Sequence, residues 1–371
     1  MKKAGRYRLF IRHSSMRDYR VPLFRLLAES HDLAIFTPSA QNEPPPDLGP
    51  NVEISYYVSG KRPLCYYLRD FLIIFRNIFL CDVFITSFVA SLYSIIGLLF
   101  SFLLKKRTIV WSERSLACKR KLWLEKWFLR RVDAFFVMGE PQRALLIYCG
   151  VSPHRIFKAN EYPGVNYSEL QPAPIYSLNS ERKRVVLYLG RFIPIKGIQY
   201  LLEAYRIIEE RHDDVLLIVA GDGELRDDLK AQARSLGIRK IEFPGYIHDP
   251  REIKFLFDQG YMLVVPSIIS KEKKGCEGGP IVVLEALSAG LPVLGTDGLI
   301  SSVQFIKNGI NGFIVPHSNS RALAEKMETM LGWKNRSAIR TNVLESFSKI
   351  RGFDFQIEVL NQAIQFVLSN R

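Results

Sequence analysis

The sequence predicts an α/β protein with two doubly wound parallel sheets, one in each half of its 371 residues. Three observations lead to this fold class. Short strand-like segments alternate with longer helical patterns along both halves, as in parallel sheets covered by helices. The run Val185–Leu189 is apolar, as expected for a strand buried on both faces. Pro, Asn and Ser residues between 171 and 180 indicate a linker between two domains.

The first half is expected to alternate strands with helices. The predicted strands are 7–11, 33–36, 82–87, 108–111 and 134–138. The predicted helices are 21–29, 66–80 and 121–131, and a proline-rich loop is expected at 41–50. We expect no secretion signal, because no apolar stretch of suitable length follows the basic N-terminal residues.

The segment 84–104 runs for 21 residues without a charge, which is long enough to cross a bilayer. Four small residues between 91 and 101 recur every three or four positions, which predicts a helix with one small-polar face. We therefore expect a buried strand followed by a buried helix. A helix lying in the membrane interface and a full membrane span remain as alternatives.

The second half repeats the alternation more regularly. The predicted strands are 185–189, 215–220, 241–243, 261–265, 293–296 and 312–315. The predicted helices are 197–211, 224–236, 280–289 and 353–368. In the helix at 280–289, proline occupies the first turn, where its missing N–H costs nothing, and Gly290 follows the last residue.

Charge is distributed unevenly along the chain. Lys and Arg number 51 against 37 Asp and Glu, and residues 1–178 hold 25 of the bases but only 14 of the acids. A basic half points to an anionic surface or a phosphorylated substrate, whereas uniform basicity would favour nucleic acid. The five cysteines show no CxxC spacing, so we expect reduced thiols and no disulfide framework.

An ordered set of motifs runs through the second half. The motifs are Leu189-Gly190-Arg191 with Lys196-Gly197, Ala220-Gly221-Asp222-Gly223-Glu224, Phe243-Pro244-Gly245-Tyr246, Val265-Pro266-Ser267, the segment 277–293, and Asn311-Gly312-Phe313-Ile314-Val315. This set resembles the C-terminal domain of family 4 retaining glycosyltransferases (glycosyl transferases group 1). The first half resembles them only loosely, at 19–24 and 163–166.

The resemblance implies a GT-B fold, in which two Rossmann-like domains face a central cleft. It implies an N-terminal acceptor-binding domain at 1–170, a linker at 171–184 and a C-terminal nucleotide-sugar-binding domain at 185–352. A C-terminal helix at 353–371 would cross back to the first domain. The implied activity is that of a hexosyltransferase that uses a nucleotide-sugar donor.

The donor diphosphate needs positive charge and N–H donors. Arg191 and Lys196 follow a predicted strand, where open α/β sheets bind ligands, and Gly190 lets the backbone come close. Arg offers a planar fork of donors and Lys a point charge. Without the motif, both would be read as solvated surface residues. The resemblance implies that both contact the donor phosphates and that they are catalytic.

The predicted helix at 280–289 adds its N-terminal amides to the same edge of the sheet. Gly278 and Gly279 precede it and can form a backbone anion nest, and Pro280 and Ile281 open it. The alternative is an ordinary glycine turn.

Two carboxylates flank this helix start. A single carboxylate can accept both ribose hydroxyls, and the resemblance gives that role to Glu285 and contact with the transferred sugar to Glu277. We expect Glu285 to stay ionised beside a helix N-terminus, which separates this pair from the acid and nucleophile of a glycoside hydrolase. Tyr246 and Ile247 are expected to pack the base.

Retention by front-side attack, with the departing phosphate as base and no metal, follows from the resemblance alone. Many relatives carry a His that follows an N-terminal strand and faces the sugar, and here Glu113 or Arg114 takes that place. The alternative for these two residues is that they cap a surface loop. His13, with Arg12 and Arg17, is expected to face the acceptor.

The segment 119–131 combines six basic residues with Trp123 and Trp127, as interfacial helices do. Together with the basic first half and the apolar segment 84–104, it favours a cytoplasmic protein held peripherally at the inner face of the cell membrane. A lipid-linked glycan acceptor, in cell-surface polysaccharide synthesis, would explain all three features, and no nucleic acid is expected. Two alternatives are a nucleotide-sugar epimerase of the same fold, and a basic membrane- or nucleic-acid-binding protein with an inactive transferase domain.

Overall fold

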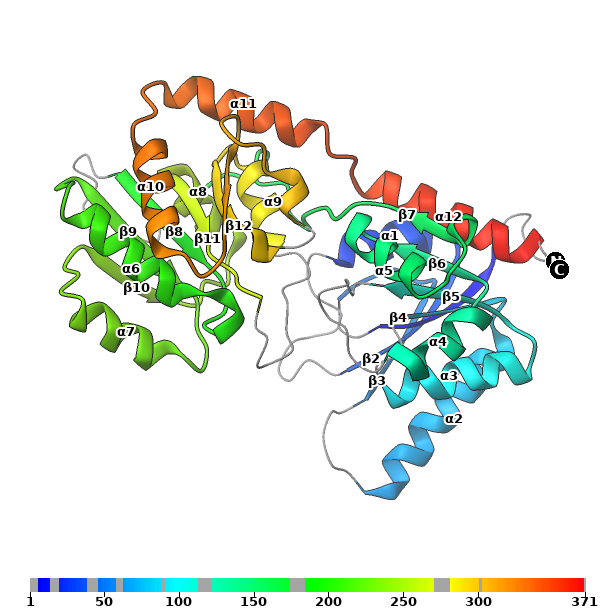
Figure 1. The fold of residues 1–371 in the computed structure, drawn as a ribbon. Helices are drawn as coiled ribbons and strands as arrows, with labels where there is room; N and C mark the ends of the chain where they lie inside the picture. The colour runs from blue at the N-terminus through cyan, green and yellow to red at the C-terminus, as the bar shows by residue number, and fades with distance from the viewer. Residues whose placement is uncertain are drawn as a thin grey trace. The chain divides into compact units, whose positions relative to one another are not determined.

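The computed structural model describes residues 6–13, 20–38, 46–57, 63–87, 91–112, 122–173, 184–269, 281–299 and 302–369. The chain forms two compact units (Figure 1): Met1–Gly164 with Arg351–Arg371, and Val165–Ile350. The second unit thus begins before the expected linker. Residues 165–173 pack on the rest of unit 2. The Tyr167 ring meets Phe257 edge-on at 5.1 Å, and the Ala173 N–H donates to the Arg251 carbonyl.

Unit 1 contains a parallel sheet of seven strands in the order β3-β2-β1-β4-β5-β6-β7. The strands are β1 (Arg8–Arg12), β2 (Asp32–Pro38), β3 (Val52–Tyr57), β4 (Val83–Ser87), β5 (Arg107–Ser112), β6 (Ala134–Val137) and β7 (Ile156–Lys158). Leu9 of β1 pairs with Leu33 on one side and Val83 on the other. The edge strands β3 and β7 were not predicted.

Helices cover both faces of this sheet. They are α1 (Val21–Ser30), α2 (Leu64–Leu80), α3 (Leu92–Leu103), α4 (Leu122–Arg131), α5 (Glu140–Tyr148) and α12 (Phe353–Ser369). The apolar residues of α1 and α12 share one core cluster with the sheet, and those of α2 to α5 share another cluster on the opposite face. The last helix of the chain is therefore part of the first unit.

The apolar segment 84–104 is a strand followed by a helix, as expected. All of β4 is buried between β1 and β5. The small face of α3 turns to the sheet, where a Cβ on Gly97 would lie 2.4 Å from the Phe84 ring. Within the described ranges, no helix combines the length and the apolar character that a bilayer crossing requires.

Unit 2 contains a parallel sheet of six strands in the order β10-β9-β8-β11-β12-β13. The strands are β8 (Arg184–Leu189), β9 (Val215–Ala220), β10 (Ile241–Gly245), β11 (Gly260–Val265), β12 (Val293–Thr296) and β13 (Gly312–Val315). The helices are α6 (Ile198–Glu209), α7 (Arg226–Ser235), α8 (Pro250–Gln259), α9 (Ile281–Ser288), α10 (Ser320–Leu331) and α11 (Arg336–Ser348). Helices α6, α7 and α10 share the main core cluster with the sheet, α8 and α9 contact β8, β11 and β12, and α11 packs on α9.

Each sheet has one point where the strand order reverses. In unit 1 the chain moves outward from β1 to β3 and returns to β4, and in unit 2 it moves from β8 to β10 and returns to β11. In open parallel sheets the crevice beyond the carboxyl ends of the strands at such a point is the usual ligand site. The predicted cations Arg191 and Lys196 follow β8, at the second of these two places.

Candidate active site

The loop after β8 brings two predicted cations to the β8/β11 switch point. Arg191 is exposed, and Lys196, in a short 3₁₀ turn at Pro194–Lys196, is 8% exposed. Between them the Phe192 ring is buried. The backbone N–H of Phe192 donates to the Asp222 carbonyl at 2.8 Å. The loop is therefore anchored at its centre, while the Arg191 side chain remains open to a ligand.

Gly197 joins this loop to the one after β11. Its φ is 65°, and a Cβ there would lie 2.1 Å from the Pro266 carbonyl oxygen. The Ile268 N–H donates to the Ile195 carbonyl at 2.9 Å. The motif Val265-Pro266-Ser267 therefore supports the Lys196 turn. The sequence contained this motif, but no role was assigned to it.

The glycines after β9 hold the same loop from the other side. The Gly190 N–H donates to the Ala220 carbonyl at 3.1 Å, and a Cβ on Gly221 would lie 1.9 Å from the Gly190 carbonyl oxygen. The motif 220–224 thus has a packing role, because only glycine permits this approach.

Glu285 lies on α9, which follows β11. Its side chain is partly exposed, and its carboxylate has no hydrogen-bond or ion-pair partner in the part of the chain that the structure describes. Burial raises the pKa of Glu285 to about 7. This carboxyl is therefore only partly ionised near pH 7, because desolvation disfavours its charged form.

A segment from the start of unit 2 crowds this carboxyl. The Tyr167 N–H donates to the Ser288 hydroxyl at 3.2 Å, and that hydroxyl donates to the Glu285 carbonyl at 2.7 Å. Burial, together with the negative charge of Glu285, raises the pKa of the Tyr167 phenol. The phenol therefore stays neutral and adds no charge to the site.

The other predicted residues of this site are only partly described. Tyr246 follows β10, is 62% exposed and meets His248 edge-on at 4.5 Å, and Ile247 beside it is half-buried. Ile281 is the first residue of α9. Glu277, Gly278, Gly279 and Pro280 lie outside the described residues, so the sugar contact and the anion nest stay predictions.

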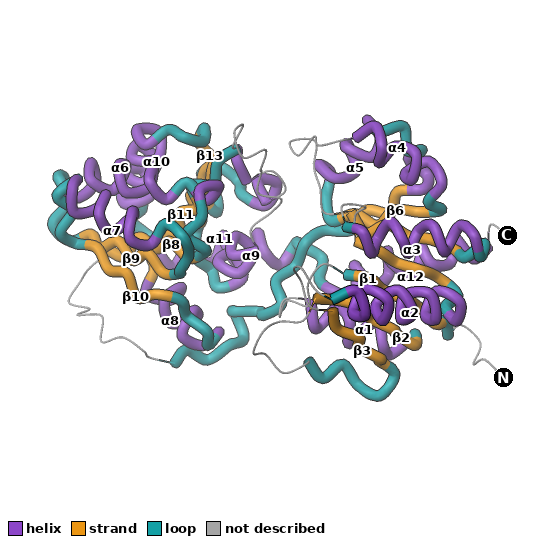
Figure 2. Tube along the Cα trace, turned by 90° about the horizontal axis from the view of Figure 1, so that it is seen from below, coloured by secondary structure: helices purple, strands orange, loops and turns teal. Residues whose placement is uncertain are grey.

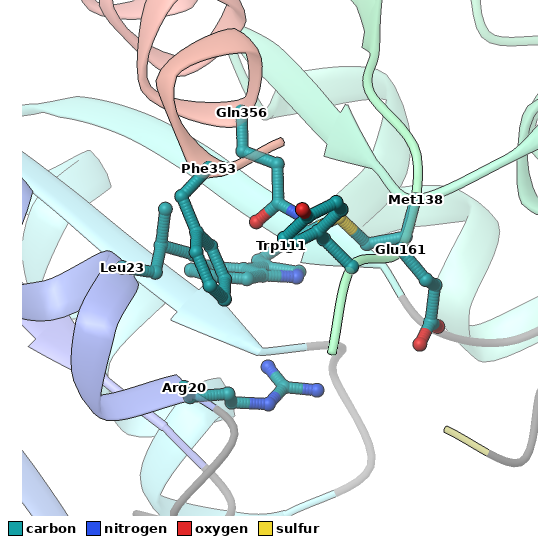
Figure 3. Close-up of a pocket in the computed structure, with 8 residues that line it drawn as sticks. Arg20, Leu23, Trp111, Met138, Glu161, Phe353 and Gln356 are labelled. Carbon is teal, nitrogen blue, oxygen red and sulfur yellow. The ribbon is translucent and has the colours of Figure 1, made fainter. Parts of the chain in front are cut away.

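Unit 1 carries a pocket at the carboxyl ends of its strands (Figure 3). Its cavity volume is about 20 Å³, room for about one water molecule, and it widens into space open to solvent. The Trp111 and Phe353 rings and the Arg20 guanidinium converge on it, and the Arg20 carbon Cζ lies 5.2 Å from the Trp111 ring centre. The remaining lining residues are Leu23, Met138, Glu161, Tyr162 and Gln356. Rings beside groups that donate and accept hydrogen bonds suit a small, flat, hydroxylated ligand.

His13 lies beneath this pocket and not on its surface. It is fully buried, accepts from Arg20 Nη1 at 2.6 Å and meets Trp111 edge-on at 5.2 Å. Arg12 turns to the opposite face of the sheet, where it donates to the hydroxyls of Ser87, Ser94 and Tyr57. The expectation that both side chains face an acceptor therefore fails, because each is used inside the unit.

Arg17, which was expected to face the acceptor, lies outside the described residues. So do Glu113 and Arg114, one of which was expected to replace the His that faces the sugar. The sequence analysis missed Arg20 and Trp111 as pocket residues. A signal was available for each: Arg20 belongs to the loose motif at 19–24, and Trp111 occupies a predicted strand end. Across the described ranges, no group of three or more His, Cys, Asp or Glu side chains is placed to hold a metal ion.

Comparison with known proteins places these features in a family context. Residues 176–342 match the family model "Glycosyl transferases group 1". An uncharacterized glycosyltransferase of Methanocaldococcus jannaschii is 34% identical over 43% of this chain and 39% of its own length. A phosphatidyl-myo-inositol mannosyltransferase of Mycobacterium leprae is 30% identical over 52% of this chain and 49% of its own length. The chain thus spans half or less of these two relatives.

A longer match covers both units. A Campylobacter jejuni α-1,4-N-acetylgalactosaminyltransferase, whose name gives an undecaprenol-diphosphate-linked glycan, is 27% identical over 76% of this chain and 72% of its own length. Among solved structures, Anabaena HepE in complex with UDP superposes with a TM-score of 0.75 at 16% identity, covering 98% of this chain and all of HepE. The glycosyltransferase WaaG gives 0.70 at 18% identity, covering 96% of this chain and 99% of WaaG. The chain therefore has the GT-B glycosyltransferase fold, and its residues 176–342 match the glycosyl transferases group 1 family.

Proposed function

We propose that this protein is a hexosyltransferase that moves a sugar from a nucleotide-diphosphate sugar to a glycan or lipid-linked acceptor. The observation that carries the proposal is the cation-bearing loop after β8, locked to the loop after β11 at the switch point of unit 2. The UDP in HepE and the acceptor names of the Mycobacterium and Campylobacter relatives support it.

The proposed donor site combines charge with orientation. Lys196 and Arg191 neutralise the diphosphate, and the amides at the start of α9, including Ile281, point at the same anion. The backbone of the Lys196 turn is anchored by the bond from the Ile268 N–H to the Ile195 carbonyl, so the Lys196 charge is carried on a fixed loop. Arg191 is exposed and would reach the same anion, and Gly278, Gly279 and Pro280 would complete the cradle.

Glu285 would accept both ribose hydroxyls, since its carboxylate lacks a partner in the described protein. Glu277 would contact the transferred sugar, and Tyr246 with Ile247 would pack the base, either uracil or guanine. Retention and metal independence are part of the proposal and rest on the family resemblance.

The unit 1 pocket is the proposed acceptor site. A saccharide presents an apolar C–H face and a rim of hydroxyls. The half-buried Phe353 and Tyr162 rings fit the first, and the Glu161 carboxylate offers acceptors for the second. Trp111, Arg20 and Gln356 are buried beneath them and support the pocket. Gln356 is held in place because its Nε2 donates to the Asn160 carbonyl at 2.7 Å.

The proposed location is the inner face of the cell membrane, with the protein attached peripherally. The excess of bases in residues 1–178 supports this location, because each basic group near an anionic leaflet contributes about 1 kcal/mol. A lipid-linked acceptor in polysaccharide synthesis would be presented at that surface.

A thermal-shift screen against UDP, GDP, ADP and their sugars tests the donor site. We expect one nucleotide to stabilise the protein. Glu285→Ala should weaken that stabilisation, and Lys196→Ala should lower turnover. Glu325→Ala and Lys326→Ala, on the far helix α10, are the matched controls. Unchanged binding and turnover in both site variants would refute the assignment, and donor turnover without acceptor would indicate an epimerase instead.

A further inference from the structure

Helix α2 exposes its most apolar stripe. Five large side chains recur every three or four positions and are open to solvent: Leu64 (73%), Leu68 (56%), Leu72 (64%), Phe75 (38%) and Phe79 (61%). This spacing places them on one helical face. In a globular protein such a stripe normally faces the core, and here it faces away from it.

The core-facing side of α2 is the more polar one. Its buried residues are Asp70, Ile74, Asn77 and Ile78. Asp70 accepts a hydrogen bond from the Tyr93 hydroxyl at 2.7 Å, and Asn77 Nδ2 donates to the Ile73 carbonyl at 2.9 Å. Asp70 is thus satisfied by a residue of α3, which supports this orientation of α2. The Asn77 bond lies within α2, and Asn77 Oδ1 is buried without a hydrogen-bond partner in the described part of the chain.

The exposed stripe continues onto α3. Phe71 and Phe75 of α2 meet the Phe100 ring of α3 edge-on at 4.9 and 5.2 Å. The two helices run next to each other over the same face of the sheet (Figure 2). We call the combined set the α2–α3 surface. It consists of Leu64, Leu68, Phe71, Leu72, Phe75, Phe79, Leu92, Leu99 and Leu103.

The size of this surface exceeds what soluble monomers usually expose. With about 200 Å² for each large apolar side chain, the exposed fractions give an area on the order of 1,000 Å², against ~300–600 Å² for the largest patch on a typical monomer. Burying this area in an apolar phase would therefore stabilise the buried state strongly.

Positive charge borders the α2–α3 surface. Arg69 and Arg76 are exposed at one edge of the α2 stripe, where Arg76 also pairs with the exposed Glu53 of β3 at 3.2 Å, and exposed Lys105 follows α3. Arg131 lies 3.8 Å over the half-exposed Trp127 ring on α4, which contacts α3. Asp70 is the one acid in α2 and α3, and it points inward.

We propose that the α2–α3 surface docks on an anionic lipid bilayer, with α2 lying in the interface plane. This inference rests on the membrane location in the proposed function and names the element responsible. Bilayer lipid supplies both an apolar layer for the leucines and anionic headgroups for the bases at its edge. A second copy of the chain fits less well, since a two-fold interface would bring the same basic edges together.

Docking would leave the unit 1 pocket uncovered. The pocket is lined from α1 and α12, which cover one face of the sheet, whereas α2 and α3 cover the other. The docking surface and the proposed acceptor site can therefore be altered separately.

Vesicle flotation tests the proposal with the full chain. We expect wild type to float with vesicles that contain one-third phosphatidylglycerol in phosphatidylcholine. The double variant Leu68→Glu/Leu72→Glu should need at least about tenfold more lipid than wild type for half-maximal binding. Ile310→Glu, at a site of unit 2 that is 47% exposed, is the matched control and should bind as wild type does. Arg69→Gln should lower the affinity for anionic vesicles roughly fivefold and should change the affinity for pure phosphatidylcholine vesicles little.

Cys65 provides a second readout, because it is a free, exposed thiol beside the stripe. With Cys118 and Cys276 replaced by serine, an environment-sensitive dye on Cys65 should shift to shorter wavelength when vesicles are added. No flotation of wild type, equal flotation of the double variant, or a dimer by sedimentation that the double variant dissociates would overturn the proposal.

The nucleotide screen separates this inference from the transferase proposal. The double variant should keep the full thermal shift with the nucleotide that stabilises wild type. Loss of vesicle binding with intact nucleotide binding is the expected result for that variant. Vesicle binding by wild type without any nucleotide stabilisation would refute the transferase and leave the lipid surface in place.

Discussion

Glu285 is expected to release a proton when a nucleotide sugar binds. Burial raises the pKa of this carboxyl to about 7, so about half of the free protein carries it protonated at pH 7. Ribose hydroxyls donate hydrogen bonds, and a bound ribose therefore favours the carboxylate. Binding should release about 0.9 proton at pH 6, about 0.5 at pH 7 and about 0.1 at pH 8.

Isothermal titration calorimetry in buffers of different ionisation enthalpy measures this count. The ligand should be the nucleotide sugar, because its phosphates are diesters that do not titrate near pH 7. Glu285→Gln should bind more weakly and release no proton. A count near zero at pH 6, or the same count in the variant, would refute the role of Glu285 as the ribose acceptor.

The same carboxyl makes stability depend on pH. The pKa of Glu285 is higher in the folded protein than its ordinary value of 4.5, so the folded state binds more protons between these values. The free energy of unfolding should therefore fall as pH rises from about 4.5 to 7, by up to about 3 kcal/mol from this group. Glu285→Gln should be more stable than wild type at pH 8 and equal to it near pH 4.

Two further predictions concern unit 2. Gly197→Ala should lower the free energy of unfolding by at least about 2 kcal/mol more than Gly237→Ala does. The two glycines have similar φ values, 65° and 68°, but only at Gly197 would the new Cβ lie 2.1 Å from a carbonyl oxygen. Equal urea midpoints for the two variants would contradict this prediction. Asp258→Asn should lower the free energy of unfolding by about 2–3 kcal/mol. The substitution removes the carboxylate that pairs with Lys254, a side chain that is only 5% exposed. Adding Lys254→Met should restore part of that loss in the same urea titration, and no recovery would argue against a penalty from an unpaired charge.

Short apolar segments were sufficient to locate several strands. The observed strands Val215–Ala220, Val293–Thr296 and Gly312–Val315 have the predicted bounds. The first two are buried along their whole length, which favours apolar residues, whereas the third is the half-buried edge strand β13. Helices α5, α8, α10 and α11 were not predicted, although the last three had a local signal. Asp249, Asn319 and Asn335 precede them, and each side chain accepts a hydrogen bond from an N–H of the first turn.

Other features depend on contacts between distant parts of the chain. The pKa of Glu285 is raised by packing that includes a segment more than a hundred residues earlier, at Tyr167, and no local pattern reports such burial. The stripe on α2 was visible as a helical pattern, but periodicity does not say which face meets the core. The buried hydrogen bond from Tyr93 of α3 to Asp70 favours the observed choice.

The membership of α12 in unit 1 affects the order in which the protein can fold during synthesis. Unit 2 is complete at Ile350, whereas the core beneath α1 lacks Leu360, Ala363 and Ile364 until the last helix has left the ribosome. At ~5–20 residues per second, the first 164 residues would wait roughly 10–40 s for their closing helix. The part of the protein that is made first should therefore be finished last, and its unfinished core is where a chaperone would be expected to bind.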